Sequence, residues 1–249
     1  MSALTIAILL LGLLSAYLLG SIPTGFVLGK ALKGIDIREH GSGNTGATNV
    51  FRVMGKGAGM TALVIDLLKG VMAVFFMHWL LSMVFANILA ADPTVQQVLQ
   101  REGSLLIYGS NVVGAPGNEL SAPLSAYFRL ESWFLMLAAL MAVLGHSKSV
   151  WLGFTGGKSA ATGLGVLLAL AWPVGLSVAA VFATALAVSR TVSVGSIAAA
   201  LSVGIFMVVM HQPLPYLLLA IAGGLYVVLR HKSNIARLLE GTEPKTFGG

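Results

Sequence analysis

The stretch ALTIAILLLGLLSAYLLGSIPTGFVLG, residues 3–29, decides the fold, because no charged side chain occurs in it before Lys30. A helix that crosses the hydrocarbon core of a bilayer needs about 20 apolar residues, and this run is longer than that. A cleaved secretory signal would have a basic start and a shorter apolar core. We therefore expect the run to be a membrane span that stays attached to the protein.

The composition of the whole chain agrees with a membrane environment. Of the 249 residues, 57% are hydrophobic and 10% are charged, whereas an ordinary soluble domain has roughly 25% charged residues. The chain contains no cysteine, which excludes disulfides, thiolate metal sites and cysteine nucleophiles. None of the five histidines lies in an H-x-x-x-H or H-E-x-x-H arrangement, so no metal site is predicted.

Further apolar segments follow at residues 60–90, 133–154, 164–188, 191–210 and 214–229. With residues 3–29 counted as the first run, the fourth is 164–188, and Trp172-Pro173 lies in its middle. A proline inside a helix removes a hydrogen-bond donor and clashes with the preceding turn. That run is therefore expected to form two short helices. The prediction is an all-α integral membrane protein with about seven transmembrane helices, some short or broken, in a single domain over residues 1–249.

The distribution of basic residues predicts the orientation of these helices. With the N-terminus outside, the segments 30–69, 146–158, Arg190 and 230–249 face the cytoplasm and hold 13 of the 15 Lys and Arg residues. Cytoplasmic loops carry an excess of basic residues, and an odd number of helices places the C-terminus on the same side. We expect residues of about 90–131 to form an extra extracytoplasmic segment, with an interfacial helix near residues 95–101.

The loops assigned to the inner face are rich in glycine and small polar residues. The first reads Gly41-Ser-Gly-Asn-Thr-Gly-Ala-Thr-Asn49. Glycines let the backbone approach a ligand closely, and successive exposed N–H groups bind anions. The loop therefore favours a phosphate site, while a tight interhelical connection with Ser and Asn as N-caps would use the same residue types. The candidate binding residues are Arg38, Ser42, Gly43, Asn44, Gly46, Asn49 and Arg52.

A second loop contains Gly156, Gly157 and Lys158. The glycines expose backbone amides, and a lysine brings a compact positive charge that suits a phosphate. The segment misses the nucleotide-binding pattern G-x-x-x-x-G-K-[ST] by one residue, because the upstream glycine is Gly153. That pattern also has to follow a strand, whereas this loop follows an apolar helix, so nucleotide hydrolysis is not favoured.

A third feature is the spacing of Arg190, Ser193 and Ser196, which predicts one shared helix face. A cation and two hydroxyls at a helix N-terminus suit an anion, although helix capping and interfacial anchoring explain them as well. The basic segment 230–245 contains His231 and Lys232 and has two interpretations. It contributes to the same site, or it lies on anionic lipid.

In chain order, these motifs resemble the bacterial acyl-phosphate:glycerol-3-phosphate acyltransferase family, the PlsY family. Four separate motifs over most of the chain carry the resemblance. Three positions depart from the family's usual residues, namely Thr155, Ser159 and Lys232, of which the first stands where the family has a lysine. The matching residues are Gly20-Ser-Ile-Pro-Thr-Gly25, Asp36-Ile-Arg38, residues 41–49, Arg52, Asp66-Leu-Leu-Lys-Gly70, Gly145-His146, residues 154–162, residues 193–196, Arg230-His231, Asn234-Ile235, Arg237-Leu238 and residues 241–245.

The resemblance implies transfer of an acyl chain from acyl phosphate to the sn-1 hydroxyl of glycerol 3-phosphate, which yields lysophosphatidate for phospholipid biosynthesis. It implies no cofactor, no metal and no nucleic acid. The expected partners are the two substrates, membrane lipid and the enzyme that produces acyl phosphate. The expected location is the bacterial plasma (inner) membrane, with the active site facing the cytoplasm. The chain also lacks the H-x4-D signature of other glycerolipid acyltransferases.

The loops and the resemblance together assign roles to the candidate residues. Ser42, Gly43, Asn44, Gly156, Gly157 and Lys158 are expected to form one phosphate pocket. Arg52, Arg190, Ser193, His231 and Lys232 are expected to place glycerol phosphate and polarise the carbonyl. The predicted catalytic residues are Ser193, His231, His146 and Lys158, and the predicted substrate-binding residues are Arg38, Ser42, Gly43, Asn44, Gly46, Asn49, Arg52, Gly156, Gly157, Arg190, Ser196 and Lys232.

The sequence leaves the proton acceptor and two rival functions open. His146, His231 or the departing phosphate could each accept the proton of the attacking hydroxyl. A secondary transporter of an anionic phosphorylated solute would also use glycine-rich helix ends, but such sites lie near the bilayer midplane between repeated halves, and the chain shows no internal repeat. A non-catalytic scaffold or lipid-binding module would leave the phosphate-type features on one side without an explanation.

Overall fold

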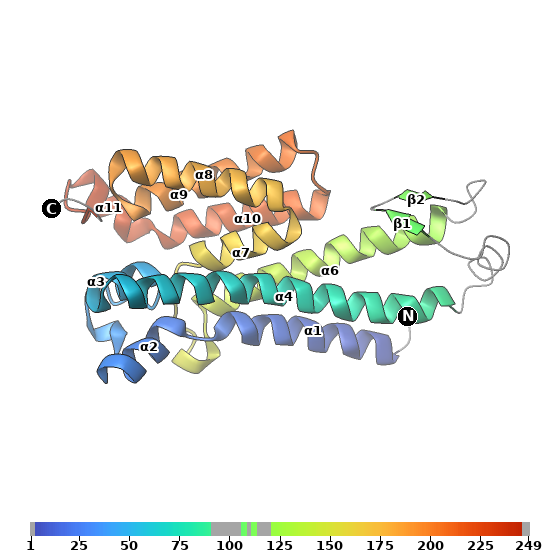
Figure 1. Cartoon of the computed structure of the whole chain (residues 1–249), viewed down its shortest axis with the longest axis horizontal. Coiled ribbons are helices and arrows are strands. Elements are labelled where there is room, and N and C mark those ends of the chain that lie inside the picture. The colour runs from blue at the N-terminus through green and yellow to red at the C-terminus, as the bar shows by residue number, and fades with distance from the viewer. Residues whose placement is uncertain (1–2, 91–105, 109–110, 114–120, 246–249) are drawn as a thin grey trace.

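The computed structural model describes residues 3–90, 106–108, 111–113 and 121–245, which are almost entirely helical (Figure 1). Long helices run along the same axis of the molecule, and the C-terminus lies at the end of the bundle opposite the N-terminus. The apolar helices are α1 (Ala3–Ser21), α4 (Lys56–Ala90), α6 (Ser121–Ser147), α7 (Ala160–Leu170), α8 (Trp172–Ser189), α9 (Val192–Val209) and α10 (Leu214–Arg230).

Shorter elements connect these helices. At the end of the bundle that holds the C-terminus lie α2 (Thr24–Lys33), the 3₁₀ turn η1 (Ile37–Glu39), α3 (Ala47–Met54) and α11 (Lys232–Leu239). A second 3₁₀ turn, η2 (Val150–Leu152), follows α6. The strands β1 (Leu106–Tyr108) and β2 (Asn111–Val113) form an antiparallel hairpin. The extracytoplasmic segment expected at about 90–131, with its helix near 95–101, falls largely outside the described residues.

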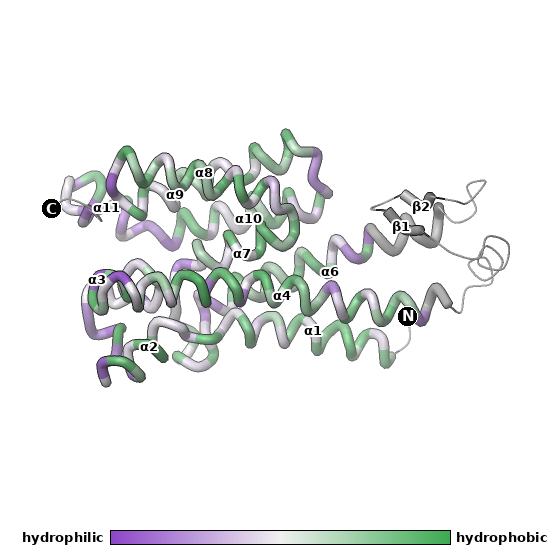
Figure 2. The backbone as a smooth tube through the Cα atoms, viewed as in Figure 1, coloured by the Kyte–Doolittle hydropathy of each residue, from purple (hydrophilic) through white to green (hydrophobic). Residues whose placement is uncertain are grey.

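The described helices have the lengths and surfaces of a membrane protein. Five of them are long and apolar enough to span a bilayer, and a sixth span arises if α10 and α11, bent by 56°, are counted as one. Large apolar side chains such as Val188, Leu201 and Val209 are exposed on the outside of the bundle, where contiguous apolar surface on a soluble monomer would be unusual. Figure 2 shows hydrophobic residues along the long helices and hydrophilic ones near α3 and α11. The prediction of an all-α integral membrane protein is confirmed.

Each predicted apolar run contains a helix, and the expected break in the fourth run is present. Helix α7 ends before Ala171, and Pro173 lies in the first turn of α8, where the backbone N–H that proline lacks has no intrahelical partner anyway. The long run at residues 3–29 is different from the prediction of one span, because α1 ends at Ser21 and α2 begins at Thr24. Pro23 accounts for this, since it interrupts the helical hydrogen bonds and restricts the residue before it.

Small residues allow the helices that carry the site to approach closely. Helix α7 packs against α4, and a Cβ atom at Gly70 of α4 would lie 2.3 Å from the carbonyl oxygen of Thr162. The reciprocal contact is equally tight, because a Cβ atom at Gly165 of α7 would lie 2.0 Å from the carbonyl oxygen of Leu67. Close packing through small residues is the usual way in which membrane helices associate. It fixes α7, and the loop before it, against α4.

Candidate active site

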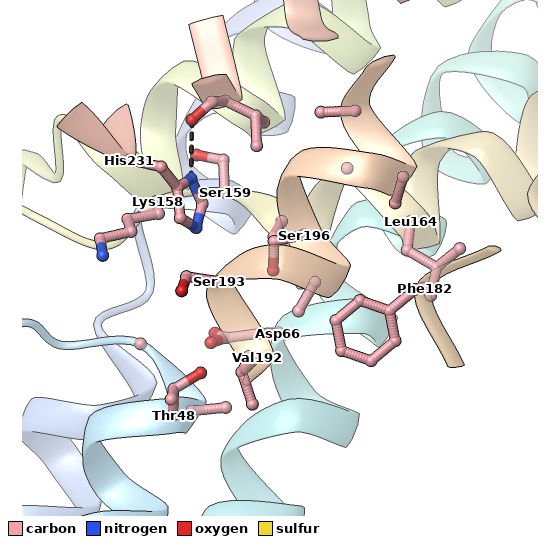
Figure 3. Close-up of a pocket in the computed structure, with 18 of the residues that line it drawn as sticks. Thr48, Asp66, Lys158, Ser159, Leu164, Phe182, Val192, Ser193, Ser196 and His231 are labelled. Atoms are coloured by element: carbon pink, nitrogen blue, oxygen red, sulfur yellow. Dashed lines mark hydrogen bonds between the residues drawn. The ribbon is translucent and has the colours of Figure 1, made fainter. Parts of the chain in front are cut away.

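A cavity of about 310 Å³ lies near the end of the bundle that holds α3 and α11. Figure 3 shows Lys158, His231 and Ser193 on one side of it and Leu164 and Phe182 on the other. The cavity therefore has a polar part and an apolar part, as an amphipathic anion requires. Its polar and charged lining residues are Ser42, Asn44, Thr48, Asn49, Arg52, Asp66, His146, Lys158, Ser159, Ser193, Ser196, His231, Asn234, Arg237 and Glu243.

The first glycine-rich loop is held in shape by Asn49, a buried residue of α3. Its Oδ1 accepts a hydrogen bond of 2.8 Å from the backbone N–H of Ser42. Its Nδ2 lies 3.0 Å from the carbonyl oxygen of His40 and 2.9 Å from that of Asn44. Gly41 permits this approach, since it has φ +62° and a Cβ atom there would lie 2.3 Å from Asn49 Oδ1. Asn49 thus shapes the loop, and its amide is engaged with the backbone.

A chain of hydrogen bonds links the second loop to the C-terminal segment. The Lys158 ammonium donates to Oδ1 of Asn234, and Nδ2 of Asn234 donates to Oε1 of Glu243 at 2.5 Å. The same Oε1 accepts a hydrogen bond of 2.8 Å from the Ser193 hydroxyl. The other oxygen, Oε2, accepts one of 2.7 Å from Nε of Arg237. Three segments far apart in the sequence therefore meet at the polar part of the cavity.

The charges in this network shift two pKa values. Burial lowers the pKa of Lys158 to about 8, a shift that the Glu243 carboxylate opposes and three guanidinium groups strengthen, those of Arg237, Arg230 and Arg52. Burial acts to raise the pKa of Glu243, but the hydrogen bonds from its three donors outweigh it, so that this pKa lies below the ordinary value of a glutamate. Near neutral pH, the site therefore holds a charged ammonium beside a charged carboxylate.

His231 lies at the junction of α10 and α11 and is buried. Its Nδ1 is 2.7 Å from the carbonyl oxygen of Val227, and a carbonyl oxygen can only accept, so Nδ1 carries the proton. In the neutral ring, Nε2 is then a hydrogen-bond acceptor. Figure 3 shows the ring on the same side of the cavity as Lys158 and Ser193.

His146 has quite different surroundings. Its Nδ1 lies 3.2 Å from the Thr162 hydroxyl and 3.6 Å from Oδ1 of Asp66. Its Nε2 faces Gly157 so closely that a Cβ atom there would lie 1.9 Å from it. His146 lines the cavity, but both ring nitrogens are enclosed by the protein.

Asp66 anchors a buried polar group in α4. Its carboxylate accepts a hydrogen bond of 2.8 Å from the Thr24 hydroxyl and forms an ion pair of 2.9 Å with Lys69. The Lys69 ammonium also donates to the carbonyl oxygen of Ile22 at 2.9 Å. The break between α1 and α2 is thereby tied to α4. Removing one partner of a buried ion pair is strongly destabilising, so this group supports the wall of the cavity.

The second glycine-rich loop does not place the backbone of its glycines at the cavity, as would be expected for a phosphate-binding loop. Nη2 of Arg230 donates to the carbonyl oxygens of Gly156 at 3.2 Å and Gly157 at 3.0 Å, and neither glycine lines the cavity. Ser159 has φ +62°, a conformation that favours glycine, and its hydroxyl donates to the carbonyl oxygen of Val143 at 2.8 Å. The Thr155 hydroxyl donates within its own loop to the carbonyl oxygen of Leu152 at 2.7 Å.

The structure brings most of the predicted site residues to the cavity. Those that line it are Ser42, Asn44, Gly46, Asn49, Arg52, His146, Lys158, Ser193, Ser196 and His231. Those that do not are Arg38, Gly43, Gly156, Gly157, Arg190 and Lys232.

For two of these residues, Arg38 and Arg190, the structure shows why they lie outside the cavity. Arg38 is held by Asp36, with Nη2 2.6 Å from Oδ2, and this hydrogen-bonded pair lowers the pKa of Asp36 to about 2. Arg190 is the C-cap of α8, with φ +58°, and precedes α9. The predicted helix face is therefore shared by Ser193 and Ser196 but not by Arg190, because helical spacing does not extend past the helix end.

Six polar or charged lining residues were not predicted as site residues, namely Thr48, Asp66, Ser159, Asn234, Arg237 and Glu243. The sequence carries a signal for some of them. Asp66 is an acidic residue in an apolar run, and such residues in spans are costly and usually functional. Asn234 and Arg237 are spaced for one helix face. In the described residues, no group of three or more His, Asp or Glu is arranged to hold a metal ion.

Fold and cavity together define a class: a membrane-embedded protein whose cavity joins cationic and hydroxyl groups to an apolar chamber, as a site for an amphipathic anion would. The chain belongs to the glycerol-3-phosphate acyltransferase family, whose pattern matches residues 10–241. It is thus a membrane acyltransferase that acts on glycerol 3-phosphate in phospholipid synthesis.

Named relatives match nearly the whole chain. The glycerol-3-phosphate acyltransferase of Nostoc sp. (strain PCC 7120 / SAG 25.82 / UTEX 2576) is 51% identical over 232 residues, which cover 93% of this chain and 89% of that protein. Glycerol-3-phosphate acyltransferase 2 of Rhizobium johnstonii (strain DSM 114642 / LMG 32736 / 3841) is 48% identical, with 94% of each chain covered. The crystal structure of PlsY (YgiH), an integral membrane glycerol 3-phosphate acyltransferase, in its glycerol 3-phosphate form matches with a TM-score of 0.71 at 35% identity, with 96% of each chain covered.

Proposed function

We propose that the protein transfers an acyl chain from acyl phosphate to the sn-1 hydroxyl of glycerol 3-phosphate and releases lysophosphatidate and phosphate. The observation that carries this proposal is the cavity itself, in which Lys158 and Arg52 share one chamber with apolar residues such as Leu164 and Phe182. A phosphate suits the first pair, and an acyl chain suits the second. The donor and the acceptor both carry a phosphate, and the donor also carries an acyl chain.

The proposed reaction needs little chemistry from the protein. The sn-1 oxygen attacks the carbonyl carbon of the mixed anhydride, the bond from that carbon to the phosphate oxygen breaks, and phosphate departs with the electron pair. Because the donor is already activated, holding the two substrates in contact supplies much of the rate enhancement. Lys158 stabilises the charge that develops on the carbonyl oxygen and on the phosphate.

His231 is the better placed of the two histidines to accept the proton of the sn-1 hydroxyl. The Val227 carbonyl oxygen fixes the proton on Nδ1, so the lone pair is on Nε2. His146 is enclosed by Thr162, Asp66 and Gly157, which favours a role in shaping the wall. The departing phosphate is the alternative acceptor.

We propose the plasma (inner) membrane of a bacterium as the location, with the cavity facing the cytoplasm. The cavity lies at the end of the bundle near α3 and α11, and 13 of the 15 Lys and Arg residues lie in the segments assigned to that side. Basic residues are enriched on the cytoplasmic side. Glycerol 3-phosphate would then reach the site from the cytoplasm, where an enzyme that produces acyl phosphate would supply the donor.

The proposed reaction is tested with purified protein in detergent, supplied with acyl phosphate and radiolabelled glycerol 3-phosphate. We expect lysophosphatidate acylated at the sn-1 position, determined at early times before acyl migration. Detergent leaves no sealed compartment, so a transporter would give no product in this assay. Absence of product from folded protein, or a product acylated first at sn-2, would contradict the proposal.

The apolar part of the cavity predicts a determinant of acyl-chain length. Gly223 of α10 lines the cavity, and a Cβ atom added there would have no atom within 4 Å. In the variant Gly223→Leu, the new side chain should occupy space that a long acyl chain needs. We expect kcat/KM for hexadecanoyl phosphate to fall about 10-fold relative to decanoyl phosphate, the size of effect that a few methylene groups produce in an apolar pocket.

The matched control is Ala222→Leu, because Ala222 is the preceding residue of the same helix, is exposed and does not line the cavity. Its ratio of the two kcat/KM values should equal that of the original chain. An unchanged ratio in Gly223→Leu would place the acyl chain elsewhere.

A further inference from the structure

Glu243 is a half-buried residue in the segment that follows α11. Its side chain is 5% exposed. Its two oxygens accept hydrogen bonds from Ser193, Asn234 and Arg237 at 2.8, 2.5 and 2.7 Å. A carboxylate so far removed from water requires such donors, and these belong to α9 and α11, two elements of the cavity wall.

The types of the partners fix the orientation of the Asn234 amide. A carboxylate can only accept hydrogen bonds, so the group of Asn234 that faces Glu243 has to be the Nδ2 amide nitrogen. An ammonium can only donate, so the group that faces Lys158 has to be Oδ1. If the charge on Glu243 is removed, the amide loses one of the two partners that fix its orientation.

We propose that Glu243 is a positioning residue that holds the Asn234 amide with its oxygen toward Lys158 and thereby keeps the charged ammonium in place at the polar part of the cavity. This role rests on the proposed function, in which Lys158 acts on substrate phosphate. It assigns to the C-terminal segment a part in the site that does not require Glu243 to touch either substrate.

The charges around Lys158 make the role of Glu243 measurable. Arg52 from α3, Arg230 from α10 and Arg237 from α11 all favour the neutral amine, as does burial. His231, at the junction of α10 and α11, is also close enough to interact with Lys158 electrostatically. Among the described groups that shift the pKa of Lys158, Glu243 is the one that favours the charged form. Loss of its charge should therefore lower the pKa of Lys158 from its value of about 8.

The test is the variant Glu243→Gln, with kcat/KM for glycerol 3-phosphate measured across the pH range. In the original chain, activity should fall as pH rises through about 8, because the ammonium loses its proton there. In Glu243→Gln this alkaline limb should move to lower pH by about one unit, a shift typical of a neighbouring charge. In Glu243→Asp, which keeps the charge, the limb should move back toward its original position.

A control variant and a labelling experiment test the role of Glu243 further. Glu240→Gln removes an exposed carboxylate from the same segment and should leave the limb in place. Competitive labelling of lysine amines, followed by peptide mass spectrometry, gives the pKa of Lys158 even if Glu243→Gln is inactive, and that pKa should be lower than in the original chain. An unchanged limb and an unchanged pKa would overturn the positioning role. Failure of the original chain to use acyl phosphate would count against the proposed function instead, because the labelling result does not depend on the reaction.

Discussion

Replacing Lys158 by methionine is expected to lower kcat/KM for glycerol 3-phosphate by about 10²- to 10³-fold. Methionine keeps an unbranched side chain of similar length but removes the ammonium that meets Asn234 at the polar part of the cavity. Loss of one preorganised group that stabilises developing negative charge has an effect of this size. Steady-state kinetics in detergent or in lipid give the value.

The matched control is Lys148→Met, in the loop that precedes the same cavity wall. Lys148 is exposed and does not line the cavity, so its replacement removes the same charge outside the site. We expect kcat/KM to stay within about 2-fold of the original, in line with the small effects of surface charges. Equal effects of the two variants would show that Lys158 acts only through the overall charge of the inner face.

Replacing Gly157 by alanine is expected to abolish most of the activity and to lower the melting temperature. The added Cβ atom would lie 1.9 Å from Nε2 of His146, a distance that no pair of non-bonded atoms tolerates, so the loop or the ring has to move. Overpacking of a buried site typically costs about 1–3 kcal/mol. Since Lys158 is the next residue, the movement should also displace its ammonium, and we expect kcat to fall at least about 10-fold.

The contact with His146 can be isolated by comparison with two other variants. Gly57→Ala adds a methyl group in α4 where no atom lies within 4 Å of the new Cβ atom, and it should leave both activity and melting temperature unchanged. His146→Ala removes the ring, so the loss of melting temperature caused by Gly157→Ala should be smaller in the double variant than in the original chain, as expected for residues in contact. Strictly additive losses would contradict the clash.

The membrane fold was largely predictable from the sequence, because hydrophobic length and backbone chemistry are local properties. The apolar runs predict the apolar helices, and Pro173 predicts the break between α7 and α8. Pro23 divides residues 3–29 by the same mechanism. The run was nevertheless predicted as one span, because its whole length is apolar. The 19 residues of α1 already suffice to cross a bilayer, so the proline can end the helix there.

The site was predictable where a motif places its own backbone in the cavity. Ser42, Lys158 and Ser193 lie in such motifs and line the cavity. Arg38 also lies in one, but its guanidinium is engaged by Asp36 two residues away, a local pairing that competes with any ligand. The sequence alone does not reveal whether such an arginine pairs with the neighbouring carboxylate or binds a ligand.

The residues that the sequence did not assign depend on tertiary contacts. Glu243 enters the site only because the chain after α11 returns to α9, where the Ser193 hydroxyl donates to it. Ser159 departs from the family's usual residue, yet it adopts the left-handed conformation and uses its hydroxyl to bond the backbone of α6. Neither arrangement has a signature in local sequence, because each depends on segments that meet only in the folded bundle.

The measurement that tests the central proposal most directly compares acyl donors. Purified protein in lipid is given radiolabelled glycerol 3-phosphate with acyl phosphate, acyl-CoA or acyl carrier protein carrying the same chain, and lysophosphatidate is quantified. We expect product from acyl phosphate and none above background from the two thioesters, because the site supplies positioned charges for an already activated mixed anhydride that carries a phosphate. Equal or faster product formation from either thioester would contradict it.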